Sequence, residues 1–174
     1  MTFVYTNKIC ITFVSTNKVC KMKIEEIIKS TLPLSIEKKT ILNIIYTKNI
    51  IGDRFNELLK PVEISEEQYN VLRILRGQKG IPCNMFVIQE RMLAKTSNTT
   101  RLVDKLLLKE LVNRAICPDN RRKMEISITQ KGLNLLSELD DSVLRHERFF
   151  SENLSPEELS QLNLLLEKYR TITI

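Results

Sequence analysis

The chain has 174 residues, with 27 lysines and arginines against 21 acidic residues and a formal net charge of +6 at pH 7. No apolar run approaches the roughly 20 residues that a membrane-spanning helix needs, and the N-terminus lacks the apolar stretch of a secretory leader. The four cysteines lack the paired spacing of a zinc site. We therefore expect a cytoplasmic protein with reduced thiols, no metal, no cofactor and no membrane partner.

Two near-identical decamers, residues 2–11 and 12–21, open the chain and carry three lysines, which is half of the net charge. We interpret them as translated repetitive DNA upstream of a native start at Met22, so that residues 1–21 are disordered or not native. The alternative is a small β-hairpin or metal-binding arm. Residues 22–174 are then expected to form a single domain.

Residues 35–60 have apolar side chains at mostly three- and four-residue intervals, which predicts a long amphipathic helix. Pro61 ends it. Ser65 and Gln68 form a capping box that opens a second helix, and Gly77 is expected to stop that helix. Asn84 is a good N-cap for a third helix, whose apolar side is expected to contain Phe86, Val87, Ile88 and Met92.

A fourth helix is expected to begin after Thr96 or Ser97, either of which can cap it. Its inward side is predicted to contain Val103, Leu106, Leu107 and Leu111. Its other side is polar and contains Ser97, Asn98, Arg101 and Lys105. This polar side is either a DNA-contacting surface or an ordinary solvated face.

Residues 114–117 read as a short strand, residues 118–120 as a turn, and residues 124–129 as a second strand with alternating apolar side chains. The predicted hairpin has a basic tip, formed by Arg121, Arg122 and Lys123. Residues 89–131 contain ten lysines and arginines and five acidic residues, whereas residues 132–174 contain four and eight. Positive charge is therefore local, as a phosphate-binding surface requires.

Two further helices are predicted, from Gln130 to about Phe150 and from Ser155 onward. Ser155 is the expected N-cap of the last helix, with Pro156 in its first turn and Glu158 completing a capping box. An apolar stripe follows, formed by Leu159, Leu162, Leu165, Leu166 and Tyr169. This stripe implies a partner helix, from the same chain or from a second copy.

Four segments, residues 64–75, 88–92, 95–106 and 119–132, resemble the MarR family of winged helix-turn-helix regulators in order and spacing. The resemblance covers about residues 36–169. It implies a mainly α fold with a small β-hairpin wing: a winged DNA-binding lobe at about 62–132, flanked by dimerisation helices at about 34–60 and 133–170. It also implies a homodimer on a two-fold-related, palindromic site in double-stranded DNA, with repression as the commoner mode.

The predicted DNA-binding site consists of Lys95, Thr96, Ser97, Asn98, Thr99, Thr100, Arg101, Lys105, Asp119, Arg121, Arg122 and Lys123. The resemblance implies the roles of Ser97 to Arg101 as the start of the recognition helix, of Arg121 as the wing arginine, and of Asp119 as the residue that orients Arg121 rather than touching DNA. Asn98 and Arg101 suit base edges, although Arg101 could equally bind phosphate, and Arg121 suits a narrow minor groove with Asp119 orienting it. Lys95, Lys105, Arg122 and Lys123 are better interpreted as phosphate contacts. The alternative for each cation is a solvated surface charge.

The chain departs from the family in the turn after the fourth helix, where Glu110 stands in place of the usual glycine. Either the turn is left-handed and places Glu110 at positive φ, with a strain on the order of 1 kcal/mol, or it takes another form.

The family resemblance also implies an effector, a small aromatic or phenolic molecule in a cleft lined by Tyr46, Phe55 or Phe149, although core packing is the plainer role for these rings. Redox sensing by Cys83 or Cys117 is a weaker alternative. An enzyme is not expected, because the single histidine, His146, lies in a charged stretch and is interpreted as a solvated helix residue. The remaining alternative is a dimeric interaction protein, such as an antirepressor, that does not bind DNA.

Overall fold

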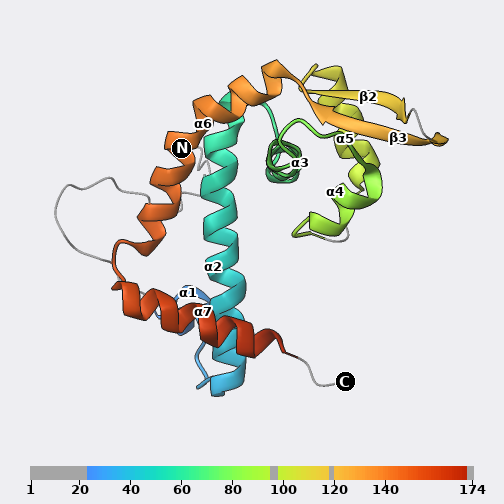
Figure 1. Cartoon of the computed structure of the whole chain (residues 1–174). Helices are drawn as coiled ribbons and strands as arrows, with labels where there is room; N and C mark the ends of the chain where they lie inside the picture. The colour runs from blue at the N-terminus through green and yellow to red at the C-terminus, as the bar shows by residue number, and fades with distance from the viewer. Residues whose placement is uncertain (1–22, 95–97, 118–119, 172–174) are drawn as a thin grey trace, which may run out of the picture. The chain divides into compact units, whose positions relative to one another are not determined.

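The computed structural model describes residues 23–94, 98–117 and 120–171, with only the backbone at 120–123 (Figure 1). The chain separates into two compact units, one up to Tyr46 and the other from Thr47. In the described part of the chain, no helix has both the length and the apolar character to cross a membrane.

The first unit contains the short helix α1 (Ile24–Ile27) and the beginning of α2 (Ile36–Leu59). Ile24 is buried, and Lys39 on α2 donates to Glu25 at 2.7 Å. The hydrogen bond from Lys39 lowers the pKa of the Glu25 carboxyl. The predicted long helix is confirmed, whereas α1 was not predicted.

The second unit contains the end of α2 and all later elements (Figure 1). They are η1 (Lys60–Val62), α3 (Glu66–Gly77), β1 (Cys83–Asn84), α4 (Met85–Arg91), α5 (Thr99–Leu108), β2 (Val112–Cys117), β3 (Asn120–Ile128), α6 (Gln130–Ser151) and α7 (Pro156–Arg170). The core of this unit joins most of these elements through buried aliphatic side chains, including Leu59, Leu72, Leu75, Ile88, Val103, Leu106, Ile126 and Leu136.

The predicted helix caps at Ser65, Asn84 and Ser155 are confirmed. Each side chain accepts a hydrogen bond from the backbone N–H three residues later, and the boxes at Ser65 and Ser155 are complete. The prediction was that Gly77 stops its helix after Arg76. In the structure the helix includes Gly77, which is the last residue of α3. The chain turns after it, at Lys79 and Gly80, which both have positive φ.

The predicted hairpin is part of a three-stranded antiparallel sheet with the order β1-β3-β2. In β2, Val112 pairs with Ile128 and Arg114 with Ile126; the register shifts between Ile116 and Cys117. The strand β1 was not predicted, and it pairs Cys83 with Ile126. The expectation of a mainly α fold with a small β wing is therefore confirmed, with one strand more than a hairpin.

The apolar side predicted for α4 is partly wrong. Ile88 and Met92 are buried, but the Phe86 side chain is 69% exposed. The predicted bounds of α6 and α7 are correct to within a residue or two. None of the residues of α7 is buried within the described chain, and Leu162, Leu164, Leu165 and Tyr169 are exposed.

Candidate nucleic-acid interface

The helix α5 begins at an asparagine cap. Asn98 Oδ1 accepts the backbone N–H of Arg101 at 3.1 Å, which satisfies one of the free donors at the helix N-terminus. The predicted caps, Thr96 and Ser97, lie outside the described residues, as does Lys95. Asn98 therefore holds the helix start, while its Nδ2 group and the second lone pair of Oδ1 remain available for a base edge.

One face of α5 is exposed along its whole length. Its side chains are Thr100, Arg101, Asp104, Lys105 and Leu108, which recur at helical spacing. The opposite face contains Val103 and Leu106, both fully buried, as predicted. The exposed face carries two cations and one carboxylate, and it is the side that a duplex could reach.

Thr99 requires a correction. It was expected to contact DNA, but its exposed fraction is only 5%. Thr99 is the first residue of α5, and its side chain lies on the inward side, one turn before Val103. It therefore packs in the protein in this structure.

The turn after α5 takes the left-handed form, the first of the two possibilities. Glu110 has φ +60°, its N–H donates to the carbonyl of Leu107, and the N–H of Leu111 donates to the carbonyl of Leu106. This is a Schellman turn, which normally places glycine at the left-handed position. Thr129, the N-cap of α6, donates through its hydroxyl to the Glu110 carbonyl at 2.8 Å and through its N–H to the Leu111 carbonyl at 3.1 Å.

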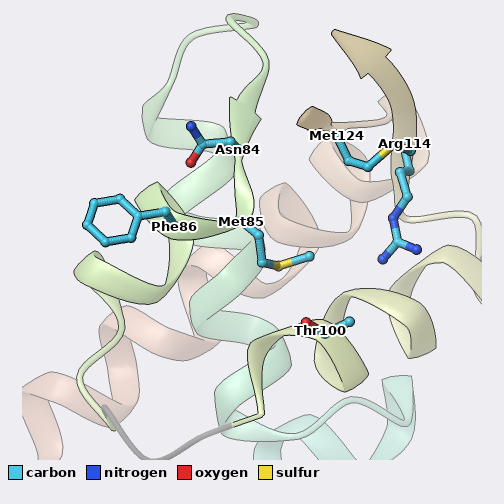
Figure 2. A pocket seen from close by; sticks show the side chains of 6 residues that line it. All are labelled: Asn84, Met85, Phe86, Thr100, Arg114 and Met124. Carbon is cyan, nitrogen blue, oxygen red and sulfur yellow. The ribbon is translucent and has the colours of Figure 1, made fainter. Parts of the chain in front are cut away.

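A shallow groove of about 470 Å³ lies between α5 and the sheet (Figure 2). Its lining residues are Asn84, Met85, Phe86, Thr100, Arg114 and Met124. Arg114 points from β2 toward the helix that carries Thr100, and its Nη2 group donates to Asp104 Oδ1 at 2.6 Å. The Nε atom of Arg114 is buried and has no hydrogen-bond partner among the described residues.

The wing is formed by β2 and β3. The backbone places Arg121, Arg122 and Lys123 in β3, next to its first residue, Asn120. Their side chains and the whole of Asp119 lie outside what the structure describes. For Arg121, Arg122 and Lys123 the structure therefore gives the position of the backbone but not of the side chains.

A second cleft, of about 320 Å³, lies between α2, α3 and α6. Of the three aromatic residues predicted to line it, only Phe55 does. Phe149 instead packs beneath the Arg54 guanidinium, 3.6 Å from its ring centroid, and Tyr46 belongs to the first unit. The lining also includes Tyr69, which the sequence did not indicate and whose pKa is raised by burial.

The interpretation of His146 as a solvated helix residue is only partly right, because it lies in α6 but is half-buried. Its ring lies 5.1 Å from that of Phe55 and 5.2 Å from that of Phe150, and its Nε2 is 3.2 Å from the Ile51 carbonyl oxygen. The Phe55 ring in turn contacts Tyr69 at 5.1 Å. A row of rings therefore joins α3 to α6 through α2, along the wall of the second cleft.

The cysteines offer little to a redox mechanism. Cys83 is buried in β1, and burial raises the pKa of its thiol, which disfavours the reactive thiolate. Cys117 is half-buried at the end of β2. Within residues 23–94, 98–117 and 120–171, no group of three His, Cys, Asp or Glu side chains is placed to hold a metal ion.

The helix pair α4–α5, the sheet behind it and the exposed face of α5 define a winged helix-turn-helix protein. Residues 64–124 match the model of the MarR family. A MarR transcription factor from Planctomyces limnophilus is 30% identical, with a TM-score of 0.61 over 78% of this chain and 98% of that one. The chain therefore belongs to the MarR family of transcription regulators.

Two further relatives extend the comparison. The HTH-type transcriptional regulator MhqR of Bacillus subtilis (strain 168) is 29% identical over 119 residues, which cover 68% of this chain and 80% of MhqR. BpsR of Bordetella bronchiseptica, whose DNA binding is regulated by 6-hydroxynicotinic acid, is 18% identical, with a TM-score of 0.70 over 82% of this chain and 100% of that one. At that identity, BpsR shares the fold alone.

Proposed function

We propose that this regulator binds a palindromic operator in duplex DNA as a homodimer, and that it acts as a repressor. The observation that carries the proposal is the exposed face of α5, where Arg101 and Lys105 lie at helical spacing. Arg121, Arg122 and Lys123 follow in β3 of the same unit. Cations on a protruding helix and on a neighbouring hairpin suit a major groove and the adjacent minor groove.

The proposed roles follow from side-chain chemistry. Arg101 and Asn98, with Thr100 beside them, face base edges in the major groove, and Arg121 enters the minor groove, where it senses groove width. The phosphates are contacted by the remaining cations of the predicted site, Lys95, Lys105, Arg122 and Lys123. These contacts position the protein without reading sequence. Thr99 is left out of this set because it is buried.

The dimer is proposed from α7. Its exposed leucines form an apolar strip that a single terminal helix would leave in water, and burial of apolar area is the main driving force for association. A two-fold dimer places its two recognition helices on half-sites about one helical turn apart. A palindromic operator matches that symmetry.

The effector is proposed to be a small aromatic or phenolic molecule in the cleft between α2, α3 and α6. Phe55, Tyr69 and Met92 supply an apolar lining, and Asn70 and Arg73 supply polar groups to orient a ligand. A cleft of about 320 Å³ has the size for one aromatic ring with substituents. Such a ligand alters DNA binding if it has different affinities for two arrangements of the protein.

The test is fluorescence anisotropy on duplex DNA from the protein's own promoter, with a random duplex as competitor and a series of salt concentrations. We expect specific binding that weakens steeply with salt, and a loss of about 1–3 kcal/mol for Arg101→Ala and for Arg121→Ala. Arg145→Ala, which removes one exposed cation from α6, is the control and is expected to bind nearly as wild type does. No preference over random duplex, with both substitutions silent, would favour an interaction protein that does not bind DNA.

A further inference from the structure

The exposed face of α5 has an acidic residue in its middle. Asp104 is the only acidic residue of α5, and it follows Arg101 by three positions and precedes Lys105. A carboxylate on a surface that approaches phosphates repels them, because like charges brought together at an interface weaken binding. A DNA-binding face therefore requires something that neutralises Asp104.

Arg114 supplies that charge from a different element. Its guanidinium donates to Asp104 Oδ1 at 2.6 Å, the length of a strong, charge-assisted bond. The backbone that carries it is held in place, because Arg114 pairs with Ile126 in β3 and the Ile126 side chain is fully buried. Figure 2 shows Arg114 extending from the strand toward α5.

The ion pair contributes little to folding. The two side chains are 27% and 50% exposed, and ion pairs at such exposed positions contribute little to stability. The helix and the strand are already joined by the Schellman turn between them. The effect of the pair should therefore be larger on DNA binding than on folding.

We infer that Arg114 is a positioning residue for DNA recognition: it neutralises Asp104 and holds its carboxylate, so that the positive charge of Arg101 and Lys105 meets the duplex undiminished by the acidic residue between them. Arg114 acts through Asp104 and makes no DNA contact of its own. The inference rests on the proposed function, because it assumes that this face of α5 lies against DNA.

The experiment measures duplex affinity by anisotropy for the wild type, Arg114→Gln, Asp104→Asn and the double variant. Arg114→Gln exposes a free carboxylate to phosphate and is expected to weaken binding about tenfold at low salt, and less at high salt. Asp104→Asn is expected to bind at least as tightly as the wild type. The double variant is expected to recover to within about threefold of the wild type, because the repelling charge is gone.

The control is Lys131→Gln, which removes one cation of the same unit that is paired with Glu110 at 3.0 Å. We expect it to change affinity by less than about twofold, and thermal unfolding of all variants to stay close to that of the wild type.

The inference is overturned if Arg114→Gln binds as the wild type does, or if Lys131→Gln loses as much affinity as Arg114→Gln. It is also overturned if the double variant stays as weak as Arg114→Gln, because Arg114 would then contact DNA or hold the fold by itself. A wild-type protein that binds no duplex overturns the proposed function, and this inference with it. A wild type that binds, with no rescue by Asp104→Asn, overturns the inference alone.

Discussion

At the residue scale, Gly132 is the one of the four glycines with the least room for a side chain. It lies in the first turn of α6, and a Cβ atom there would stand 2.4 Å from the Leu111 carbonyl oxygen and 2.8 Å from Ile128 Cγ1. The Leu111 carbonyl cannot move easily, because it accepts the N–H of Thr129. The close approach of α6 to the turn after α5 therefore requires glycine.

We expect Gly132→Ala to lower the free energy of unfolding by about 1–3 kcal/mol, the usual cost of forcing an extra methyl group into a packed site. The matched control is Gly77→Ala, at the last residue of α3, where a Cβ meets no atom within 4 Å. It should be neutral or stabilising by up to about 1 kcal/mol. The measurement is urea unfolding at one fixed protein concentration, and equal midpoints for the two variants would contradict the prediction.

Other residues show what sequence reveals at this scale. Positive φ at Glu110 was predictable, because the helix ends there and a Schellman turn requires a left-handed residue whatever its type. The burial of Thr99 and the ring contacts of His146 were not predictable, because both depend on which elements pack against them. The sequence around Thr99 and around His146 looks the same as it would around a solvated helix position.

At the scale of the element, the recognition helix α5 depends on its cap. Asn98→Ala removes the side-chain acceptor and is expected to cost about 1 kcal/mol of stability. Asn98→Asp keeps the acceptor and adds a charge that the helix N-terminus favours, so stability should be retained. The added negative charge would face phosphate, so the affinity of the Asn98→Asp variant for duplex DNA should fall.

These two variants separate folding from DNA contact. Urea unfolding reports the cap, and anisotropy on the promoter duplex reports the contact. Wild-type affinity for Asn98→Asp would show that the start of α5 lies away from DNA, even if the cap prediction holds.

Elements with strong local signals were predictable and the others were not. The capping boxes at Ser65 and Ser155 depend only on neighbouring residues, and both are present. The strand β1 has only two residues, Cys83 and Asn84, and it exists because β3 lies beside it. A strand so short has no alternation of its own, so its sequence cannot indicate it.

At the scale of the whole molecule, the exposed leucines of α7 predict the oligomeric state. Leu165→Glu places a charge on the apolar strip, where the Leu165 side chain is now 56% exposed. Burying that charge in a subunit contact is costly, so the variant should be a monomer of about 20.3 kDa, whereas the wild type should have twice that mass. Light scattering after size-exclusion chromatography measures both.

Gln161→Glu is the control, because it adds the same charge at an exposed polar position of α7. Gln161→Glu should remain dimeric and bind DNA. Leu165→Glu should lose both its partner subunit and its affinity for the operator. A wild-type mass of one chain would contradict the prediction.

The family could be predicted from four ordered segments, because together they specify a helix pair, a protruding helix and a basic hairpin. The lining of the cleft between α2, α3 and α6 could not be predicted residue by residue. Phe55 and Tyr69 come together from α2 and α3 only in the folded unit, and Phe149 lies under Arg54 although its spacing on α6 suits a lining residue equally well.

The link between the end of α5 and the start of α6 has a mechanical consequence. Thr129 bonds to two carbonyls of the turn and Gly132 lies against one of them, so the start of α6 is tied to the end of α5. The cleft contacts α6 at Val143, about 14 residues further along, or roughly 21 Å of helix. If a ligand in the cleft tilted α6, each degree of tilt about the cleft end would displace the end of α5 by roughly 0.4 Å over that length.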